Sequence, residues 1–337
     1  MPHTLVKQGG IGFLWALLRS WLTPLPVSVY KCRNAALTAE VVRASGDGKF
    51  DLCVADFLYA VPNVGLVGST PVLLFEHNVE YMIWRRASAT STNPIRRALL
   101  GLEWRKMRRY EIRACRQAKL TITVSEDDRL MLDEDVPESR KVAIPTGVDV
   151  GYFDSDDDTL EQPEEIVFTG SMDWHPNEDA MCYFINSILP LLRREAPEVS
   201  LTIVGRNPSR QLRDAAAAAG VTVTGTVDDV RPYIQRASVY VVPLRIGGGT
   251  RLKIYEALAM GKAVVSTTIG AEGLPLEEGV HILRADEPDA FAGKVLDLLR
   301  NRARRKELGL AGRRLMEREY SWSRVAQDFE RQCRTLV

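Results

Sequence analysis

A glycine-rich turn followed by charged residues at helical spacing is the stretch of this sequence best suited to do chemistry. Gly247, Gly248 and Gly249 follow an apolar run that ends at Pro243, and a helical pattern begins at Thr250. Such a turn exposes backbone N–H groups and the positive end of a helix dipole, which together attract phosphate. The spacing is not that of the Walker loop. The turn therefore predicts an anion site of another kind.

Two charged side chains on the same helix extend this prediction. Lys253 lies one turn into the helix, and Glu256 follows three residues later on the same face. The cation can reach a diphosphate, and the carboxylate can accept hydrogen bonds from a pair of sugar hydroxyls. We therefore expect a nucleoside diphosphate with its ribose on Glu256. The pattern alone leaves open that Lys253 and Glu256 are an ordinary surface pair beside a plain turn.

Composition restricts the class of protein. The chain has 337 residues, of which 45% are apolar and 26% charged, and its formal net charge is zero. These values predict a globular protein of about two domains and give no indication of a nucleic-acid partner. No segment is long and apolar enough to span a bilayer, because Arg19, Pro24 and Pro26 interrupt residues 11–29.

The cysteines indicate a reducing compartment. Their number is odd and no two form a C-x-x-C motif, which favours buried thiols over a disulfide framework. The five are Cys32, Cys53, Cys115, Cys182 and Cys333. We therefore expect a cytoplasmic protein.

The elements that must position these residues alternate between strands and helices. In the first half, residues 51–57, 71–77, 120–125 and 141–149 are predicted strands, and residues 93–117 a long helix. In the second half, predicted strands 165–170, 200–205, 221–225, 238–243 and 263–268 alternate with helices 177–195, 209–219, 230–236 and 250–260. This α/β alternation predicts open parallel sheets, which bind ligands beyond the carboxyl ends of their strands. Gly170, Gly205 and Gly225 close three strands and permit close approach of a ligand or a loop.

Domain boundaries follow from the same pattern. We predict an N-terminal domain over residues 1–152, an acidic linker over 153–164 and a C-terminal domain over 165–320. Residues 321–337 are expected to form a helix that packs back on the N-terminal domain.

Three stretches resemble the retaining glycosyltransferases of family 4, in particular the bacterial branch that builds exopolysaccharides and cell-envelope glycans. They are GGGTRLKIYEALAMGKAVVSTTIGAEGL, AIPTGVD and FTGSMDWHPNEDA. The resemblance spans roughly residues 50–322. It implies the GT-B fold, in which two Rossmann-like domains face each other across a cleft. The donor, a nucleotide sugar, would bind the C-terminal domain, and a glycan or lipid-linked acceptor the N-terminal one. The resemblance also implies an incomplete N-terminal domain, since only fifty residues precede the strand at 51–57.

The resemblance assigns roles around the glycine-rich turn. Glu256 matches the second glutamate of the family's E-x7-E motif, which binds the nucleotide ribose, whereas Gly248 replaces the first glutamate. Backbone N–H groups of Gly248, Gly249 and Thr250 are then expected to hold the sugar or diphosphate.

Cations for the diphosphate are expected from the same helix. The family often has an Arg and a Lys after the first C-terminal strand, but Ser171 and Asn177 occupy those positions here. Arg251 and Lys253 are therefore predicted to supply the charge, with Arg206 as a weaker candidate that is equally compatible with a plain surface arginine. Gly170 is counted with the substrate-binding residues.

In the N-terminal half, the resemblance points to His77. This residue closes the strand in LLFEHNVE and matches a family histidine near the transferred sugar, although a lone histidine there is often structural. Its neighbours Glu76 and Glu80 are expected to face solvent. Thr146 lies in a stretch that borders the family's cleft, together with Ser125, Gly147 and Asp149.

The predicted chemistry needs neither a metal nor a cofactor. Backbone N–H groups, a helix dipole and two cations can stabilise the departing nucleoside diphosphate. The D-x-D pattern in residues 154–158 falls in the predicted linker and is assigned to a solvated loop. Two alternatives stay open: a non-catalytic nucleotide-sugar-binding remnant or partner subunit, and a GT-B-fold epimerase of nucleotide sugars.

A peripheral contact with an anionic membrane surface is also predicted. Residues 85–119 contain many cations and only two opposing acids, Glu103 and Glu111. The apolar, aromatic stretch over residues 13–22 is the second feature that favours such contact at the inner face of a membrane.

Overall fold

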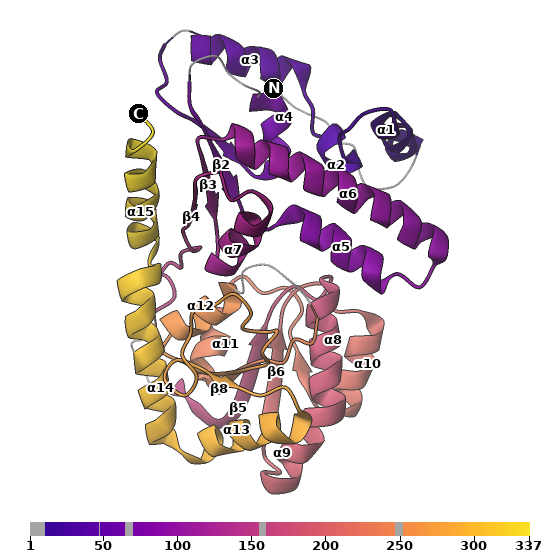
Figure 1. Cartoon of the computed structure of the whole chain (residues 1–337). Helices are drawn as coiled ribbons and strands as arrows, with labels where there is room; N and C mark the ends of the chain where they lie inside the picture. Colours follow the sequence, from indigo (N-terminus) through magenta and orange to yellow (C-terminus); the bar gives the residue numbers. More distant parts are fainter. Residues whose placement is uncertain (1–10, 47, 65–69, 155–159, 247–251) are drawn as a thin grey trace. The chain divides into compact units, whose positions relative to one another are not determined.

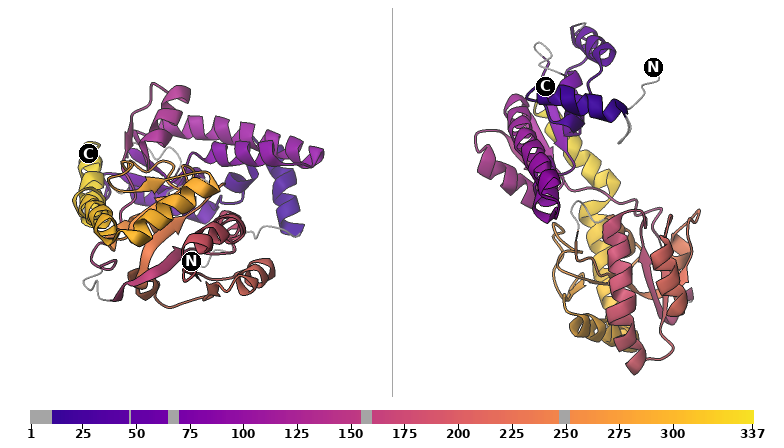
Figure 2. Two further views of the ribbon diagram at one scale, coloured as in Figure 1. Left: turned by 90° about the horizontal axis from the view of Figure 1, so that it is seen from below. Right: turned by 90° about the vertical axis from the view of Figure 1, so that its right-hand side faces the viewer.

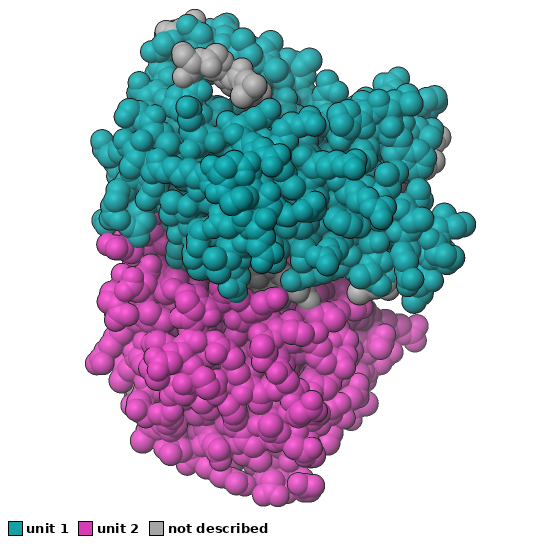
Figure 3. Space-filling model, in the orientation of Figure 1, with its two compact units in different colours: residues 1–145, 327–337 teal, residues 146–326 magenta. Residues whose placement is uncertain are grey.

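The computed structural model describes residues 11–46, 48–64, 70–154, 160–246 and 252–337, which form two compact units (Figures 1 and 3). Unit 1 comprises Met1–Pro145 and Gln327–Val337, and unit 2 comprises Thr146–Ala326. The predicted linker at 153–164 falls inside unit 2, and its last residues begin the first strand of that unit.

Unit 1 contains a four-stranded parallel sheet in the order β1-β2-β3-β4. The strands are β1 (Cys53–Asp56), β2 (Val72–Glu76), β3 (Leu120–Thr123) and β4 (Lys141–Ala143). Cys53 is opposite Val72, and Leu73 is opposite Leu120. These runs are short and apolar because central parallel strands are covered on both faces. All four predicted strands are confirmed, each somewhat shorter than its pattern.

The longest helix of unit 1 is α6 (Pro94–Gln117), which confirms the predicted helix at 93–117. It begins where the Asn93 side chain accepts hydrogen bonds from the backbone N–H groups of Ile95 and Arg96. It packs against α5 (Glu80–Thr90). The remaining helices of this unit are α1 (Ile11–Trp21), α2 (Val27–Tyr30), α3 (Ala35–Gly46), η1 (Leu58–Ala60), α4 (Val61–Val64) and α7 (Glu126–Asp135).

Unit 2 contains a six-stranded parallel sheet in the order β10-β9-β8-β5-β6-β7. Its strands are β5 (Gln162–Thr169), β6 (Ser200–Val204), β7 (Thr222–Val223), β8 (Ala237–Val242), β9 (Ala263–Ser266) and β10 (Leu283–Arg284). From β5 the chain proceeds outward to β7 and then returns to β8 on the other side of β5. This order is doubly wound, and its reversal lies between β5 and β8, where ligands of such sheets bind. The five predicted strands are confirmed, and β10 was not predicted.

Helices cover both faces of the unit 2 sheet (Figures 1 and 2). The described helices of this unit are α8 (His175–Tyr183), η3 (Phe184–Ile188), α9 (Leu189–Glu195), α10 (Arg210–Ala218), α11 (Arg231–Arg236), α12 (Leu252–Ala259), α13 (Pro288–Arg300), α14 (Arg302–Leu315) and η4 (Met316–Tyr320), and α15 (Trp322–Arg334) begins in this unit. The predicted helix at 177–195 is thus three consecutive segments, with the π-helix η3 in the middle. The hydrophobic core of unit 2 includes the fully buried Phe168, Tyr240 and Val264.

Helix α15 contributes residues to both units. Its end belongs to unit 1, where the Phe329 ring lies 5.5 Å from the Phe75 ring. Near the C-terminus, the Arg140 guanidinium donates to the Thr335 hydroxyl at 2.9 Å. Its start belongs to unit 2, where the Trp322 ring lies against Gly147. A side chain at position 147 would clash with that ring, so glycine is needed there.

Candidate functional site

The switch point of the unit 2 sheet is built around Gly170. This glycine follows β5, and its φ of +158° is one that other residues rarely adopt. A Cβ at this position would lie only 2.7 Å from the Lys253 Nζ and 2.8 Å from the Asn177 Nδ2. Glycine therefore allows the lysine of α12 to lie close to the carboxyl end of β5.

Lys253 is held at this edge by a neutral partner. Its Nζ donates a hydrogen bond of 2.7 Å to the Asn177 Oδ1, and it lies 4.1 Å from the centroid of the Phe168 ring. The Asn177 Nδ2 in turn donates to the Ser171 carbonyl at 2.8 Å. Asn177 fixes the ammonium through a neutral amide, and the carboxyl of Glu256 on the same helix also interacts with that charge. A fixed positive charge at a switch point is suited to a phosphate group.

Sequence reasoning missed the part that Asn177 plays. It noted only that Asn177 is not a cation, because no local spacing connects positions 177 and 253. The signal was available in the topology: Asn177 opens the helix after β5, Lys253 opens the helix after β8, and these are the two strands at which the order reverses.

Glu256 lies one turn after Lys253 on α12 and is half-buried. Burial raises the pKa of its carboxyl, and the nearby Lys253 charge opposes that rise. Among the described residues, no group donates a hydrogen bond to this carboxylate. A half-buried acceptor of this kind suits a donor from outside the chain, such as a sugar hydroxyl.

The other predicted residues of this site divide into three groups. Arg206 lies at the same edge, where its Nε donates to the Ser171 hydroxyl at 2.7 Å. Thr146 precedes Gly147, and no described contact joins it to Lys253 or Glu256. Gly248, Gly249, Thr250 and Arg251 lie outside the described residues and stay predictions.

In unit 1, His77 follows β2 and is embedded in aromatic side chains. Its Nε2 lies 2.7 Å from the Asp56 Oδ1. Its ring stacks on Phe57 with centroids 3.8 Å apart and also contacts Phe75 at 4.4 Å. A carboxylate oxygen can only accept, so the Nε2–H donates this hydrogen bond to Asp56, and in a neutral imidazole the Nδ1 is then an acceptor.

Phe57, whose ring stacks on His77, has a strained backbone conformation. Its φ is +69°, a left-handed value that is costly for a bulky residue, on the order of 1–3 kcal/mol. Its N–H donates to the Phe75 carbonyl at 2.9 Å, which ties β1 to β2 at this point. Asp56 and Phe57 were not predicted as partners of His77. Adjacent parallel strands end at the same edge, so the strand pairing alone was enough to find them.

The expectation that Glu76 and Glu80 face solvent is wrong. Glu76 is 1% exposed, and Glu80 is also buried. The carboxylate of buried Glu111 on α6 accepts hydrogen bonds from the N–H groups of Glu80 and Tyr81 at 2.9 and 2.8 Å. Burial raises the pKa of Glu111 to about 8 and that of Glu76 well above its ordinary range. Alternation along β2 turns Glu76 inward, under the helix that covers the sheet.

Sequence comparison identifies the relatives of this chain. Residues 163–301 match the family model described as glycosyl transferases group 1. A phosphatidyl-myo-inositol mannosyltransferase of Mycobacterium tuberculosis is 33% identical over 212 residues, covering 59% of this chain and 55% of that enzyme. An uncharacterised protein of the cps region of Klebsiella pneumoniae is 23% identical and covers 82% of this chain and 72% of its own length. The chain thus spans about half the length of the mannosyltransferase it matches.

Structure comparison extends the likeness over both units. Sucrose-phosphate synthase of Thermosynechococcus elongatus gives a TM-score of 0.68 at 18% identity, covering 89% of this chain and 78% of that one. HepE of Anabaena in complex with UDP gives a TM-score of 0.68 at 14% identity, covering 89% and 82%. The chain therefore has the α/β fold of GT-B glycosyltransferases, and its residues 163–301 carry the sequence features of group 1 glycosyl transferases.

Proposed function

We propose that this protein transfers a sugar from a nucleotide-diphosphate sugar to a glycan or lipid-linked acceptor, with retention of the anomeric configuration. The observation that carries the proposal is the placement of Lys253 on the switch point of unit 2. Its Nζ is fixed at 2.7 Å from the Asn177 Oδ1, with Glu256 one turn away on the same helix. These two side chains match the charge and hydroxyl pattern of a nucleoside diphosphate.

In this proposal the donor binds unit 2 in one orientation. The diphosphate accepts from Lys253 and from the N–H groups at the start of α12, and Arg251 adds a second charge. The ribose hydroxyls donate to the Glu256 carboxylate. Names of the relatives support nucleotide-linked donors: one matched mycobacterial enzyme is described as GDP-mannose-dependent, and solved HepE structures contain UDP and UDP-glucose.

The reaction exchanges one bond at the anomeric carbon for another. The bond from that carbon to the diphosphate oxygen breaks, and a bond to an acceptor hydroxyl oxygen forms on the same face. The acceptor proton passes to the departing diphosphate. Negative charge grows on the leaving group, and Lys253 with the helix dipole stabilises it where it develops. We propose that these groups suffice without a divalent metal.

We assign His77 to the sugar-transfer step, with Asp56 as its positioning residue. When the Nε2–H donates to Asp56, the Nδ1 of the neutral ring can accept a hydrogen bond from a hydroxyl. Mannosyltransferases that act on phosphatidyl-myo-inositol or its mannoside are among the relatives, which supports a lipid-linked acceptor.

The transferase is favoured over the two alternatives. The two mycobacterial relatives with a named activity are mannosyltransferases. Geometry also supports it, since Lys253 is fixed where a leaving diphosphate needs charge.

A panel of nucleotide sugars tests the proposal. GDP-mannose, UDP-glucose and their relatives are incubated with the protein, and release of nucleoside diphosphate is measured beside binding by calorimetry. We expect slow donor hydrolysis without acceptor and faster release with a crude lipid extract. Binding with no release would leave the non-catalytic alternative, and a product sugar of inverted hydroxyl configuration would establish the epimerase. Absence of binding to every donor would contradict all three.

A further inference from the structure

Helix α6 presents one exposed stripe whose chemistry changes along its length. Ile95, Leu99 and Leu102 are exposed at spacings of four and three residues, and Ile95 is 72% exposed. Further along the same face, the side chains are Arg109 and Arg113, both exposed. Helical periodicity places these five residues in a single row. The row is therefore apolar toward its N-terminal end and cationic toward its C-terminal end.

The cations of this row differ from their neighbours on the same helix. Arg108 and Arg116 form ion pairs with Asp135 and Glu138. By contrast, Arg109, Arg113 and the adjacent Arg105 have no carboxylate within ion-pair distance among residues that the structure describes, although Arg105 lies over the Trp104 ring. Three unneutralised guanidinium groups so close together repel each other and favour an external anion.

Helix α1 places apolar side chains beside this row. Among the side chains of this helix that the structure describes, Trp15, Leu18, Arg19 and Trp21 are exposed, and Leu22 follows them. Trp15 is 59% and Leu22 89% exposed. The helix end is nonetheless fixed to α6, because the Lys106 Nζ donates to the Ser20 carbonyl at 2.8 Å. The exposed apolar side chains therefore belong to an ordered surface.

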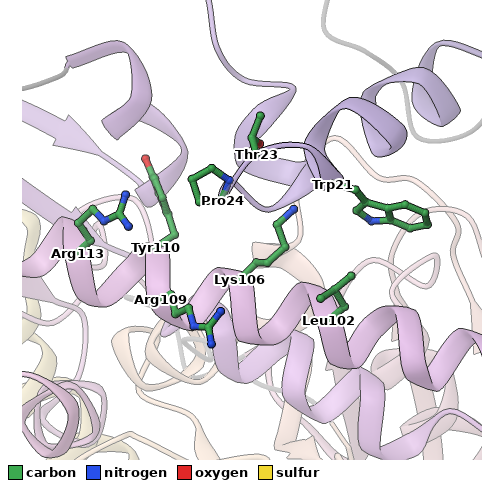
Figure 4. A pocket seen from close by; sticks show the side chains of 8 residues that line it. All are labelled: Trp21, Thr23, Pro24, Leu102, Lys106, Arg109, Tyr110 and Arg113. Carbon is green, nitrogen blue, oxygen red and sulfur yellow. The ribbon is translucent and has the colours of Figure 1, made fainter.

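A pocket of about 230 Å³ lies where the two helices meet. It is lined by Trp21, Thr23, Pro24, Leu102, Lys106, Arg109, Tyr110 and Arg113 (Figure 4). In Figure 4, Trp21 and Leu102 lie at one end of the pocket and Tyr110 and Arg113 at the other. The pocket thus joins the apolar part of the surface to the cationic part, and its size suits a phosphate group with part of the moiety attached to it.

We propose that this face of unit 1 docks on an anionic lipid surface. Trp15, Leu18 and Leu22 of the α1 region enter the interface, and the exposed apolar side chains of α6 lie beside them. Tryptophan and cations are the side chains that favour the boundary between headgroups and acyl chains. Arg105, Arg109 and Arg113 attract the lipid phosphates, one of which occupies the pocket.

The combination of cationic and apolar side chains favours an anionic lipid surface over other partners. A nucleic acid would use the arginines but not the row of exposed aliphatic side chains, and a second copy of the chain would have to supply an acidic face. No described helix is both long and apolar enough to cross a bilayer, so the contact is peripheral. This inference goes beyond the proposed function, because lipid binding does not require the donor site.

Vesicle co-sedimentation of the full chain tests the proposal. Vesicles of phosphatidylcholine alone are compared with vesicles containing phosphatidylglycerol, at low and at high salt. Binding is expected only with the anionic lipid and should fall as salt rises, because the arginines act through screened charge. No sedimentation with anionic vesicles at low salt overturns the proposal, as does equal binding to the neutral vesicles.

Two variants locate the surface. Arg105, Arg109 and Arg113 changed to Gln should weaken partition into anionic vesicles roughly tenfold to a hundredfold. Trp15→Ser combined with Leu22→Ser should weaken it roughly tenfold, since less apolar area enters the interface. All five of the changed side chains are exposed, so the melting temperature of both variants should match that of the unchanged chain.

Matched changes in unit 2 provide the controls. Arg194, Arg210 and Arg302 changed to Gln remove the same charge from exposed positions of unit 2, and Leu160→Ser with Leu310→Ser removes exposed apolar side chains there. These controls should bind vesicles like the unchanged chain. If the controls weaken binding as much as the test variants, the effect is one of net charge, and the assigned face is wrong. Loss of a dimer on size exclusion in the Trp15 variant, without loss of vesicle binding, would assign the face to self-association instead.

Discussion

The two units are built on the same kind of parallel sheet, but the charged side chains at the carboxyl ends of the strands have different partners in each unit. In unit 2, Lys253 is held by the neutral amide of Asn177, with Glu256 one turn away on the same helix. In unit 1, His77 is matched with Asp56, and the acids beneath it are buried with raised pKa values. One edge therefore offers a fixed cation, and the other offers a polar pair above buried acids whose pKa values are raised.

This difference shows that the side chains at an edge, together with the strand order, decide what the edge can bind. The strand order of unit 2 reverses between β5 and β8, whereas the described strands of unit 1 follow in simple sequence. A diphosphate suits the edge of Lys253. A neutral hydroxyl suits the edge of His77.

The largest effect is expected from Lys253→Ala. Loss of one preorganised charge at the leaving group typically lowers turnover about 10²–10³-fold. Asn177→Ala should lower turnover less, about tenfold, because the lysine remains but is no longer fixed. Turnover of a responsive donor is measured for both, with the exposed Arg302→Ala as control. If Lys253→Ala retains full turnover, the assignment of the cation is wrong.

His77→Ala should distinguish the role of the unit 1 edge in turnover from the role of the unit 2 edge in nucleotide binding. Turnover should fall roughly a hundredfold, while the affinity for UDP or GDP should change little, because the nucleotide rests on the other unit. Asp56→Asn should lower turnover about tenfold and alter the pH profile of turnover, since the amide no longer fixes the tautomer. Parallel loss of nucleotide affinity, or a lower melting temperature, would restore a purely structural role for His77.

The buried acids of unit 1 predict a stability that falls as pH rises. The Glu111 pKa is about 8 in the folded chain and near 4.5 when unfolded. Below pH 4.5 both states hold the proton, and above it the unfolded state releases the proton first. The free energy of unfolding should therefore decrease by roughly 1–3 kcal/mol from pH 6 to 8.

Glu76→Gln provides the matching variant. It removes a second buried acid whose pKa is raised by burial, and then by the Glu111 charge. Denaturant unfolding at pH 6 and pH 8 should show a smaller difference for this variant than for the unchanged chain. Exposed Glu134→Gln serves as control. A difference that is the same in all three proteins would rule out the buried acids as its source.

The smallest effect is expected from a chelator. If Lys253, Arg251 and the helix dipole stabilise the leaving group, turnover in EDTA should match turnover with magnesium or manganese. Turnover that stops in EDTA and returns with either ion would show that a metal supplies the charge instead.

Most strands and the long helix were predictable because their patterns are strong. Residues 120–125 are a short apolar run, and the helix at 93–117 has an Asn cap and a proline in its first turn. The strand β10 was missed because it has two residues. Helix α1 was missed because residues 11–29 were assessed only for membrane contact.

The candidate site was predictable only in its local part. Lys253 and Glu256 share a helix, so spacing alone connects them. Asn177 and Asp56 are separated from their partners by long stretches of chain, and only the pairing of strands brings them together. The burial of Glu76 and Glu80 could not be derived from the local sequence, because the covering helix α6 supplies the groups that surround them.

Calorimetric titration of UDP and GDP into three proteins tests the central claim most directly. The full chain and His77→Ala should bind one of the nucleotides with similar affinity. Glu256→Ala should bind it roughly tenfold to a hundredfold more weakly, because a carboxylate hydrogen-bonded to a diol contributes about 1.5–3 kcal/mol. An affinity unchanged by Glu256→Ala, or lost in His77→Ala, would contradict the placement of the nucleotide on unit 2.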